Sequence, residues 1–155
     1  MKSRSMIVII SVLIMSLFLS PVPLRAIDII TKSTSIDKTY RQNDQIELYA
    51  TIINNKTDIL TVENFNVTII YAKAIAKQVR VAKRIIKDLG NIKLDYHESL
   101  SVHVIIPLKD LPPDTYNLTA SFLYRYGVGE SRRIFVILNA KFQLLPFIEI
   151  PPTVI

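Results

Sequence analysis

The stretch from Ser99 to Tyr126 constrains the fold most, because apolar and polar residues alternate along two runs separated by a proline-rich corner. The apolar positions of the first run are Leu100, Val102, Val104 and Ile106, and those of the second are Tyr116, Leu118, Ala120, Phe122, Tyr124 and Tyr126. A period of two residues places one face of a sheet in the core and the other face in water. We therefore expect two half-buried β-strands joined by a tight corner.

Similar alternation recurs along the rest of the chain and predicts about seven strands. The expected strands cover residues 27–36, 45–54, 64–72, 78–87, 99–107, 115–126 and 132–145. In the last of these, the side chains expected to point inward are Ile134, Val136, Leu138, Ala140, Phe142 and Leu144. Short strands without intervening helices predict an all-β chain folded as an antiparallel β-sandwich.

The segment from Ala72 to Leu89 supports two interpretations. Apolar residues such as Ile75, Val79 and Ile86 recur at helical spacing, and Gly90 could end a helix. The same segment also fits an extended strand. Because strands are expected on both sides, we favour an edge strand, with a short helical turn near Ala74.

Residues 1–26 have the features of a targeting segment. Lys2 and Arg4 precede an uncharged apolar run from Met6 to Leu19, and prolines follow it. This pattern indicates a signal peptide cleaved after Ala26. Extended to Leu24, however, the run is nearly long enough for an uncleaved membrane anchor. In both cases the positive start places the remaining chain outside, with membrane contact only through this segment.

Composition excludes several classes of function. The formal charge of +6 includes three basic residues in or beside the targeting segment, and without them 16 basic residues face 13 acidic ones. That balance does not give the dense basic face of a nucleic-acid-binding protein. With three glycines, the chain has no glycine-rich phosphate loop or dinucleotide fingerprint. The absence of cysteine excludes disulfides and cysteine-ligated metals.

No constellation of catalytic residues is present in the sequence. There is no G-x-S-x-G elbow for a nucleophilic serine. His97 and His103, with Asp95 and Glu98 nearby, are the residues that could suggest a metal site. We expect one histidine in a loop and the other on an outward strand position, so they do not converge. We therefore predict no catalytic residues, no cofactor and no metal ion.

Tyr116 begins an alternating strand directly after the turn Leu111–Thr115, which contains two prolines. This arrangement resembles the tyrosine corner of immunoglobulin-like sandwiches. The resemblance implies that the ring of Tyr116 lies in the core and that its hydroxyl group bonds to an upstream backbone group.

Two further stretches resemble the cell-adhesion-related domain of bacterial and archaeal surface proteins. They are Asn43–Leu48 followed by Thr51–Asn55, and Leu89–Ile92 followed by Glu98–Leu100. The resemblance extends over residues 36–140 and implies an immunoglobulin-like surface module without catalytic residues. The chain departs from that family in having Asn43 where a glycine is common, and in a long basic segment in its middle.

Three sequons could accept N-linked glycans on an exported chain. The acceptor residues are Asn55, Asn66 and Asn117. Asn55 falls in an expected turn, and Asn66 and Asn117 fall on the polar positions of their strands, so we expect all three to face water.

The middle of the chain carries one basic run, which is Lys73, Lys77, Arg80, Lys83, Arg84 and Lys87. One interpretation is an edge strand that its charges protect from pairing with other chains. The other is a contact patch for an anionic surface, such as an acidic glycan or lipid headgroups.

Together these features favour an exported, non-enzymatic surface domain that binds a cell-envelope protein or glycan. The alternative is a subunit of an extracellular filament assembled by strand exchange. In that case the apolar tail over residues 146–155, or the stretch 27–36, would add to the sheet edge of a neighbouring copy. The compact leader, the absence of cysteine and the composition rich in Ile and Lys favour an archaeal source.

Overall fold

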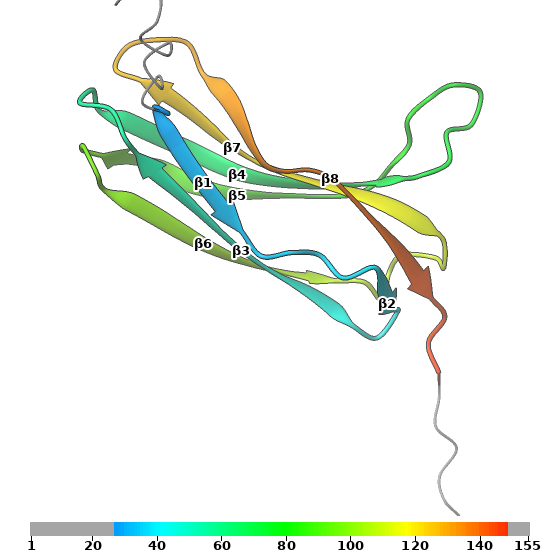
Figure 1. Ribbon diagram of the computed structural model, residues 1–155. Helices are drawn as coiled ribbons and strands as arrows, with labels where there is room; N and C mark the ends of the chain where they lie inside the picture. The colour runs from blue at the N-terminus through cyan, green and yellow to red at the C-terminus, as the bar shows by residue number, and fades with distance from the viewer. Residues whose placement is uncertain (1–26, 149–155) are drawn as a thin grey trace, which may run out of the picture.

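A computed structural model describes residues 27–148 of the chain (Figure 1). This part contains eight β-strands and no helix. The strands are β1 (Ile29–Ser33), β2 (Thr39–Arg41), β3 (Gln45–Asn54), β4 (Leu60–Tyr71), β5 (Val81–Leu94), β6 (Ser99–Pro107), β7 (Thr115–Tyr126) and β8 (Arg132–Leu145). The predicted targeting segment and most of the predicted apolar tail lie outside the described residues.

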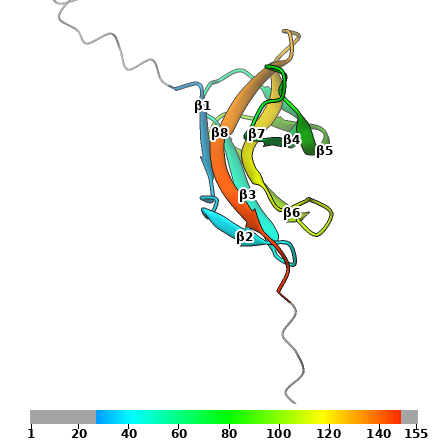
Figure 2. The ribbon, with the colours of Figure 1, turned by 90° about the vertical axis from the view of Figure 1, so that its right-hand side faces the viewer.

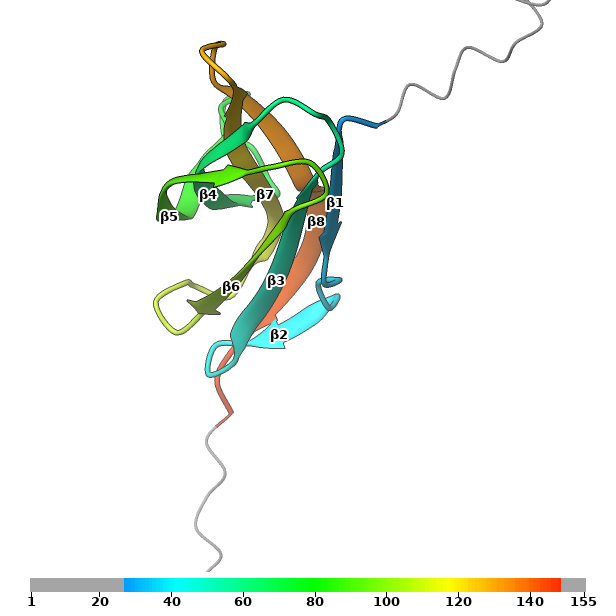
Figure 3. The ribbon, with the colours of Figure 1, turned by 90° about the vertical axis from the view of Figure 1, so that its left-hand side faces the viewer.

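The strands form two sheets that pack face to face (Figures 2 and 3). One sheet has the order β1-β3-β6 and the other has the order β2-β8-β7-β4-β5. All pairings are antiparallel except the short parallel pairing of β2 with β8. The chain crosses between the sheets from β3 to β4, from β5 to β6 and from β6 to β7, as in immunoglobulin-like sandwiches. The predicted all-β sandwich is confirmed.

The core lies between the sheets and consists mainly of side chains that the alternation pointed inward. On β3, β6 and β7 the buried apolar side chains are Ile46, Leu48, Ala50, Ile52, Val102, Val104, Ile106, Tyr116, Leu118, Ala120 and Phe122. A strand with one apolar face can be stable only when that face is covered. The pleat therefore places the opposite residues of each strand on the surface, where a binding site can form.

Tyr116 joins the proline-rich corner to this core. Its side chain is fully buried, and its hydroxyl group donates a hydrogen bond to the carbonyl oxygen of Pro112. The ring stacks on Phe142 at 5.5 Å and contacts Tyr71 at 5.1 Å between centroids. This is the contact that the tyrosine-corner resemblance implies, and it connects the corner to strands β4 and β8.

One predicted core residue, Leu138, lies on the surface with 73% of its side chain exposed. The register of β7 against β8 changes twice here, from Leu118–Ala140 to Ala120–Ile137 and then to Ser121–Phe135. Each bulge adds one unpaired residue and reverses the facing of the residues around it. The inward prediction for Leu138 was wrong because simple alternation cannot anticipate these extra residues.

The ambiguous segment forms a hairpin connection followed by a long strand. The expected helical turn near Ala74 is absent, and a tight turn with positive φ at Ala76 (53°) and Lys77 (62°) stands in its place. Strand β5 starts at Val81, three residues later than predicted, and continues to Leu94. Gly90, with φ of 65°, lies in a bulge inside β5, where the ladder to β4 changes register.

Other strands also differ from the predictions. Strand β1 is shorter than the predicted 27–36, since it covers Ile29–Ser33. Strand β4 begins at Leu60, four residues before the predicted start. Strand β2 was not predicted, because three residues are too few to show a period. It pairs with the end of β8, so the first part of the chain contributes one strand to each sheet.

Candidate functional site

A shallow polar trough crosses the outer face of the five-stranded sheet. Its lining residues come from four adjacent strands, and its cavity volume is about 320 Å³. We call it the outer trough, and its residues are Asn66, Thr68, Arg84, Thr119, Ser121, Arg133 and Phe135. Cross-strand pairing brings these residues together, because Thr68 lies opposite both Thr119 and Arg84, and Ser121 lies opposite both Asn66 and Phe135.

Hydrogen bonds fix part of the trough floor. The guanidinium Nη1 of Arg133 donates to Ser121 Oγ at 2.8 Å, and Ser121 is buried. The hydroxyl of Thr68 donates to Asn66 Oδ1 at 3.3 Å. Within residues 27–148, neither Arg84 nor Arg133 forms an ion pair, and no carboxylate lines the trough. Although Arg133 donates one hydrogen bond to Ser121, both guanidinium groups keep further N–H donors that no carboxylate among these residues neutralises, and these donors can bind an anion.

The structure divides the predicted basic patch among three places. Lys83 and Lys87 reach from β5 to the free edge of β6. Lys83 Nζ donates to the carbonyl oxygen of Pro107 at 2.7 Å and lies 2.9 Å from Asp110 Oδ1. Lys87 Nζ donates to the carbonyl oxygen of His103 at 3.2 Å. We call these contacts the lysine clasp, and they join the edges of the two sheets.

The other four basic residues do not share the clasp. Arg84 points to the opposite face of β5, into the outer trough. The guanidinium of Arg80 stacks over the ring of Tyr71 at 4.3 Å, at the base of the β4–β5 hairpin. Lys73 and Lys77 are exposed in the connection of that hairpin. The six residues therefore do not form one continuous surface.

The three sequon asparagines are all partly exposed. Asn66 lies in the outer trough, and Asn117 lies on the same sheet opposite Ile70 and Lys141. Asn55 is in the β3–β4 connection, where its Nδ2 donates to the carbonyl oxygen of Ile27 at 3.0 Å. A glycan on Asn66 would fill the trough. Asn117 lies two residues from Thr119 on the same face of β7, beside the trough, whereas Asn55 lies in a connection outside it.

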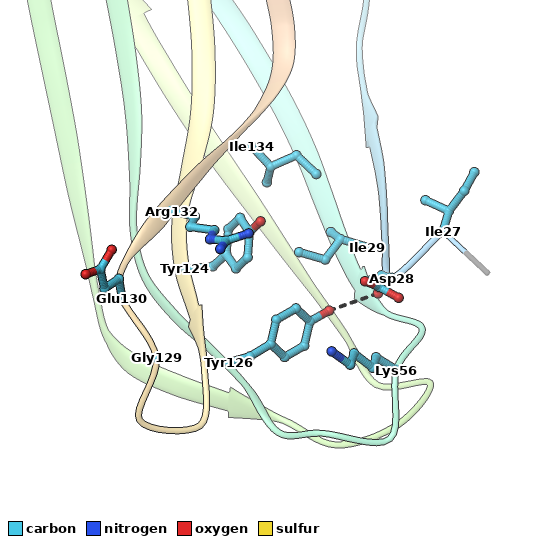
Figure 4. A pocket seen from close by; sticks show the side chains of 10 residues that line it. All are labelled: Ile27, Asp28, Ile29, Lys56, Tyr124, Tyr126, Gly129, Glu130, Arg132 and Ile134. Carbon is cyan, nitrogen blue, oxygen red and sulfur yellow. Dashed lines mark hydrogen bonds between the residues drawn. The ribbon is translucent and has the colours of Figure 1, made fainter. Parts of the chain in front are cut away.

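A second cleft, of about 460 Å³, lies between the start of β1 and the β7–β8 hairpin (Figure 4). Ile29, Tyr124 and Ile134 form its apolar side. The hydroxyl of Tyr126 donates to the carbonyl oxygen of Asp28 at 3.0 Å, as the dashed line in Figure 4 marks. Burial, followed by the negative charge of Asp28, raises the pKa of Tyr126 to about 12. These contacts fasten β1 to the hairpin and bring no nucleophile and base together.

The two histidines lie apart and each stacks on a tyrosine. His103 is on β6 and stacks on Tyr49 at 4.2 Å between ring centroids, and His97 stacks on Tyr96 in the β5–β6 loop at 3.6 Å. Among residues 27–148, no group of three His, Asp or Glu side chains is positioned to hold a metal ion.

No helix in the described part of the chain has the length and apolar character needed to cross a membrane.

Comparison with known proteins shows the fold class and leaves the family open. No family model and no curated protein matches the sequence. Among solved structures, the sporulation control protein Spo0M from Bacillus subtilis has a TM-score of 0.53 at 6% identity, over 76% of this chain and 49% of that one. AvmM, which catalyses macrocyclization in alchivemycin A biosynthesis, has a TM-score of 0.53 at 12% identity, over 83% and 93%. The C-terminal domain of Wzt has a TM-score of 0.53 at 9% identity, over 80% and 77%.

The chain spans about half the length of the Spo0M structure. At these identities, the likeness shows that the chain is a β-sandwich and assigns no activity. One of the three similar proteins is an enzyme, but low identity carries no catalytic residue across to this chain.

Sequence reasoning missed the outer trough as a unit. Strand parity did place Asn66 on an outward position, and Arg84 was part of the predicted basic patch. Arg133 and Phe135, however, reach the trough only through the shifted register of β8. Cross-strand register is a long-range property that a single sequence does not display.

Proposed function

We propose that the chain is an exported, non-enzymatic immunoglobulin-like domain at the cell surface, and that it binds an acidic glycan of the cell envelope through the outer trough. The observation that carries this proposal is the pair of guanidinium groups, Arg84 and Arg133, without carboxylate partners in a polar trough. The predicted leader and the resemblance to the cell-adhesion-related domain support the location and the adhesive role.

The chemistry of the trough matches an acidic sugar. Guanidinium groups bind carboxylate or sulfate oxygens through two parallel hydrogen bonds. Asn66, Thr68 and Thr119 supply donors and acceptors that suit sugar hydroxyls. Phe135, which is 46% exposed, offers an apolar surface to the carbon–hydrogen face of a sugar ring. Because these groups project from hydrogen-bonded strands, the backbone that carries them is already ordered, and only the side chains lose conformational freedom when a ligand binds.

Binding of oligogalacturonate, measured by calorimetry on the purified protein, tests the proposal, with neutral dextran oligosaccharides as the comparison ligand. We expect oligogalacturonate to bind and Arg84→Gln or Arg133→Gln to weaken it roughly 10- to 100-fold, because a hydrogen bond to a charged group contributes about 1.5–3 kcal/mol. The matched control is Arg132→Gln, since Arg132 lines the other cleft. Equal binding of both sugars, or an equal loss in the control, would contradict the proposal.

The sequons give an independent check of the exported state. Mass spectrometry of protein purified from its native host should show a glycan on Asn55 or Asn117. Protein modified on Asn66 should not bind oligogalacturonate, because the attached glycan would occupy the trough. Unmodified peptides at all three sites would remove this support for export.

One observation favours the second candidate, a filament subunit assembled by strand exchange. Strand β2 pairs with β8 only over residues 143–145, so the outer edge of β8 before residue 143 is not paired with a strand among the described residues. A donated strand could add there. Size-exclusion chromatography separates the candidates, because a filament subunit forms larger species as its concentration rises and a monomeric module does not.

A further inference from the structure

The connection between β4 and β5 projects from the sandwich at the end away from the start of β1 (Figure 1). Its exposed apolar side chains are Ile75 (55%) and Val79 (68%). Lys73 and Lys77 alternate with them and are also exposed. We call residues 73–79 the finger. Two exposed β-branched side chains therefore lie beside two lysines on one short connection.

The finger has a defined shape. The carbonyl oxygen of Ile75 accepts a hydrogen bond from the backbone N–H of Gln78 at 2.9 Å, which closes a two-residue turn. Both central residues, Ala76 and Lys77, have positive φ, although glycine and asparagine are favoured in such turns. Strain of this kind persists where the surrounding structure holds it, and it is found often at functional sites.

The base of the finger is anchored to the core. The backbone N–H of Tyr71 donates to the carbonyl oxygen of Arg80 at 3.0 Å, and the guanidinium of Arg80 stacks on the Tyr71 ring. Tyr71 in turn contacts Tyr116 of the corner. Contacts with the sandwich therefore hold the base of the finger in place, while the side chains at its tip are exposed to solvent.

Every charged side chain of the finger itself is basic. Along the chain, the nearest acidic residues are Glu63 and Asp88, and neither lies in the connection. In the sheet, Asp114 lies beside the base of the finger, because Thr115 accepts a hydrogen bond from the backbone N–H of Ala72 at 2.9 Å. Glu63 is held in an ion pair with Arg125 at 2.6 Å. The finger therefore presents positive charge together with apolar surface, which is the combination that binds the interface of an anionic bilayer.

We propose that the finger is a membrane-contact element that docks on an anionic lipid bilayer. Ile75 and Val79 enter the boundary between headgroups and acyl chains, and Lys73 and Lys77 lie against lipid phosphates. A stable protein partner would require a buried interface of roughly 1,000 Å² or more, which a single narrow turn does not offer. A free anion would not require the apolar pair. This inference is independent of the proposed glycan binding, because no finger residue lines the outer trough.

The absence of cysteine from residues 1–155 permits a direct test with a single introduced cysteine. Val79→Cys is labelled with a fluorophore whose emission shifts to the blue in an apolar environment. The matched control is Leu138→Cys, because Leu138 is also a well-exposed apolar residue but lies on β8. Vesicles of phosphatidylcholine mixed with phosphatidylglycerol provide the anionic surface, and vesicles of phosphatidylcholine alone provide the neutral one.

We expect a blue shift at position 79 with anionic vesicles, little shift with neutral vesicles, and none at position 138. Replacing Lys73 and Lys77 by glutamine should weaken the binding of labelled protein roughly fivefold for each lysine removed. Both labelled variants contain residues 1–26, so any anchoring by that segment would affect them equally. A shift at position 79 alone therefore reports insertion of the finger. Equal shifts at positions 79 and 138, or no shift at position 79, would overturn the inference.

A second set of variants separates the finger from the trough. Arg84→Gln with Arg133→Gln should leave the shift at position 79 unchanged. If that double variant abolishes the shift, the anionic surface binds the trough and the finger proposal fails. Loss of oligogalacturonate binding together with an unchanged shift at position 79 is the expected result, and it supports both site assignments.

Discussion

The tyrosine corner allows the most direct test of what holds this fold together. Tyr116→Phe keeps the ring and removes only the hydroxyl group, which donates to the carbonyl oxygen of Pro112. An intramolecular hydrogen bond contributes about 0.5–1.5 kcal/mol net to stability. Pro112 itself is exposed, so water can reach its carbonyl when the hydroxyl is absent. We therefore expect a loss of about 1 kcal/mol.

The loss of the whole ring should cost much more. The ring is fully buried and contacts Tyr71 and Phe142. Removal of a large aromatic side chain from a core costs about 3–5 kcal/mol, because packing contacts are lost and a cavity remains. Tyr116→Ala is therefore expected to bring the domain close to unfolding, since small domains have total stabilities of about 5–15 kcal/mol.

Urea and thermal unfolding followed by circular dichroism measure both effects. For a domain of this size, about 1 kcal/mol corresponds to a decrease in Tm of roughly 3–6 °C. Tyr124→Phe is the matched control on the same strand, because its hydroxyl forms no hydrogen bond within residues 27–148. If Tyr116→Phe and Tyr124→Phe unfold at the same temperature, the corner hydrogen bond does not stabilise the fold and the reasoning is wrong.

Three further predictions follow from other contacts. Lys83→Gln should lower stability by about 1 kcal/mol or less, because the ion pair of Lys83 with Asp110 is partly exposed. In the same variant the Asp110 pKa, which Lys83 lowers, should rise toward its usual value in an NMR titration. The Tyr126 pKa is raised to about 12 in the folded state. The protonated Tyr126 hydroxyl therefore contributes to the free energy of unfolding below the unfolded pKa of about 10, and this contribution is lost as the pH rises between these two values. Urea unfolding at increasing pH should show this decline, and Tyr126→Phe should reduce it. Ala76→Asn should stabilise the finger turn by roughly 1 kcal/mol, since asparagine tolerates positive φ better than alanine does. Slower amide exchange at Gln78 would show that gain, and unchanged exchange would contradict it.

The sequence predicted those parts of the fold that follow from local alternation. Along β3, every second residue from Ile46 to Ile52 is apolar and buried, and β7 behaves in the same way from Tyr116 to Phe122. In these strands the pairing register is regular enough for parity alone to assign the core face.

The remaining differences between prediction and structure depend on contacts between strands, which the alternation of residues along one strand does not show. Leu138 was placed wrongly because β8 carries two bulges, whose positions depend on β7 as a partner. The basic run was predicted to form either a charged edge strand or one contact patch. Strand β5 does lie at the edge of its sheet, but Lys83 and Arg84 point to opposite faces of it and contact different neighbours, so the six residues do not form one patch. The trough required the register of four strands together. A single sequence lists these residues, but only the folded sheet shows which of them become neighbours.

The lysine clasp has a consequence for how copies of this domain stand beside one another. Bare backbone at the margin of a sheet invites a strand from another molecule. At this flank two ammonium groups occupy carbonyl oxygens that an intruding chain would need, and an incoming strand would have to displace them. The clasp would therefore oppose strand addition at this flank, and a neighbouring copy would have to use another margin, such as that of β8 or β1.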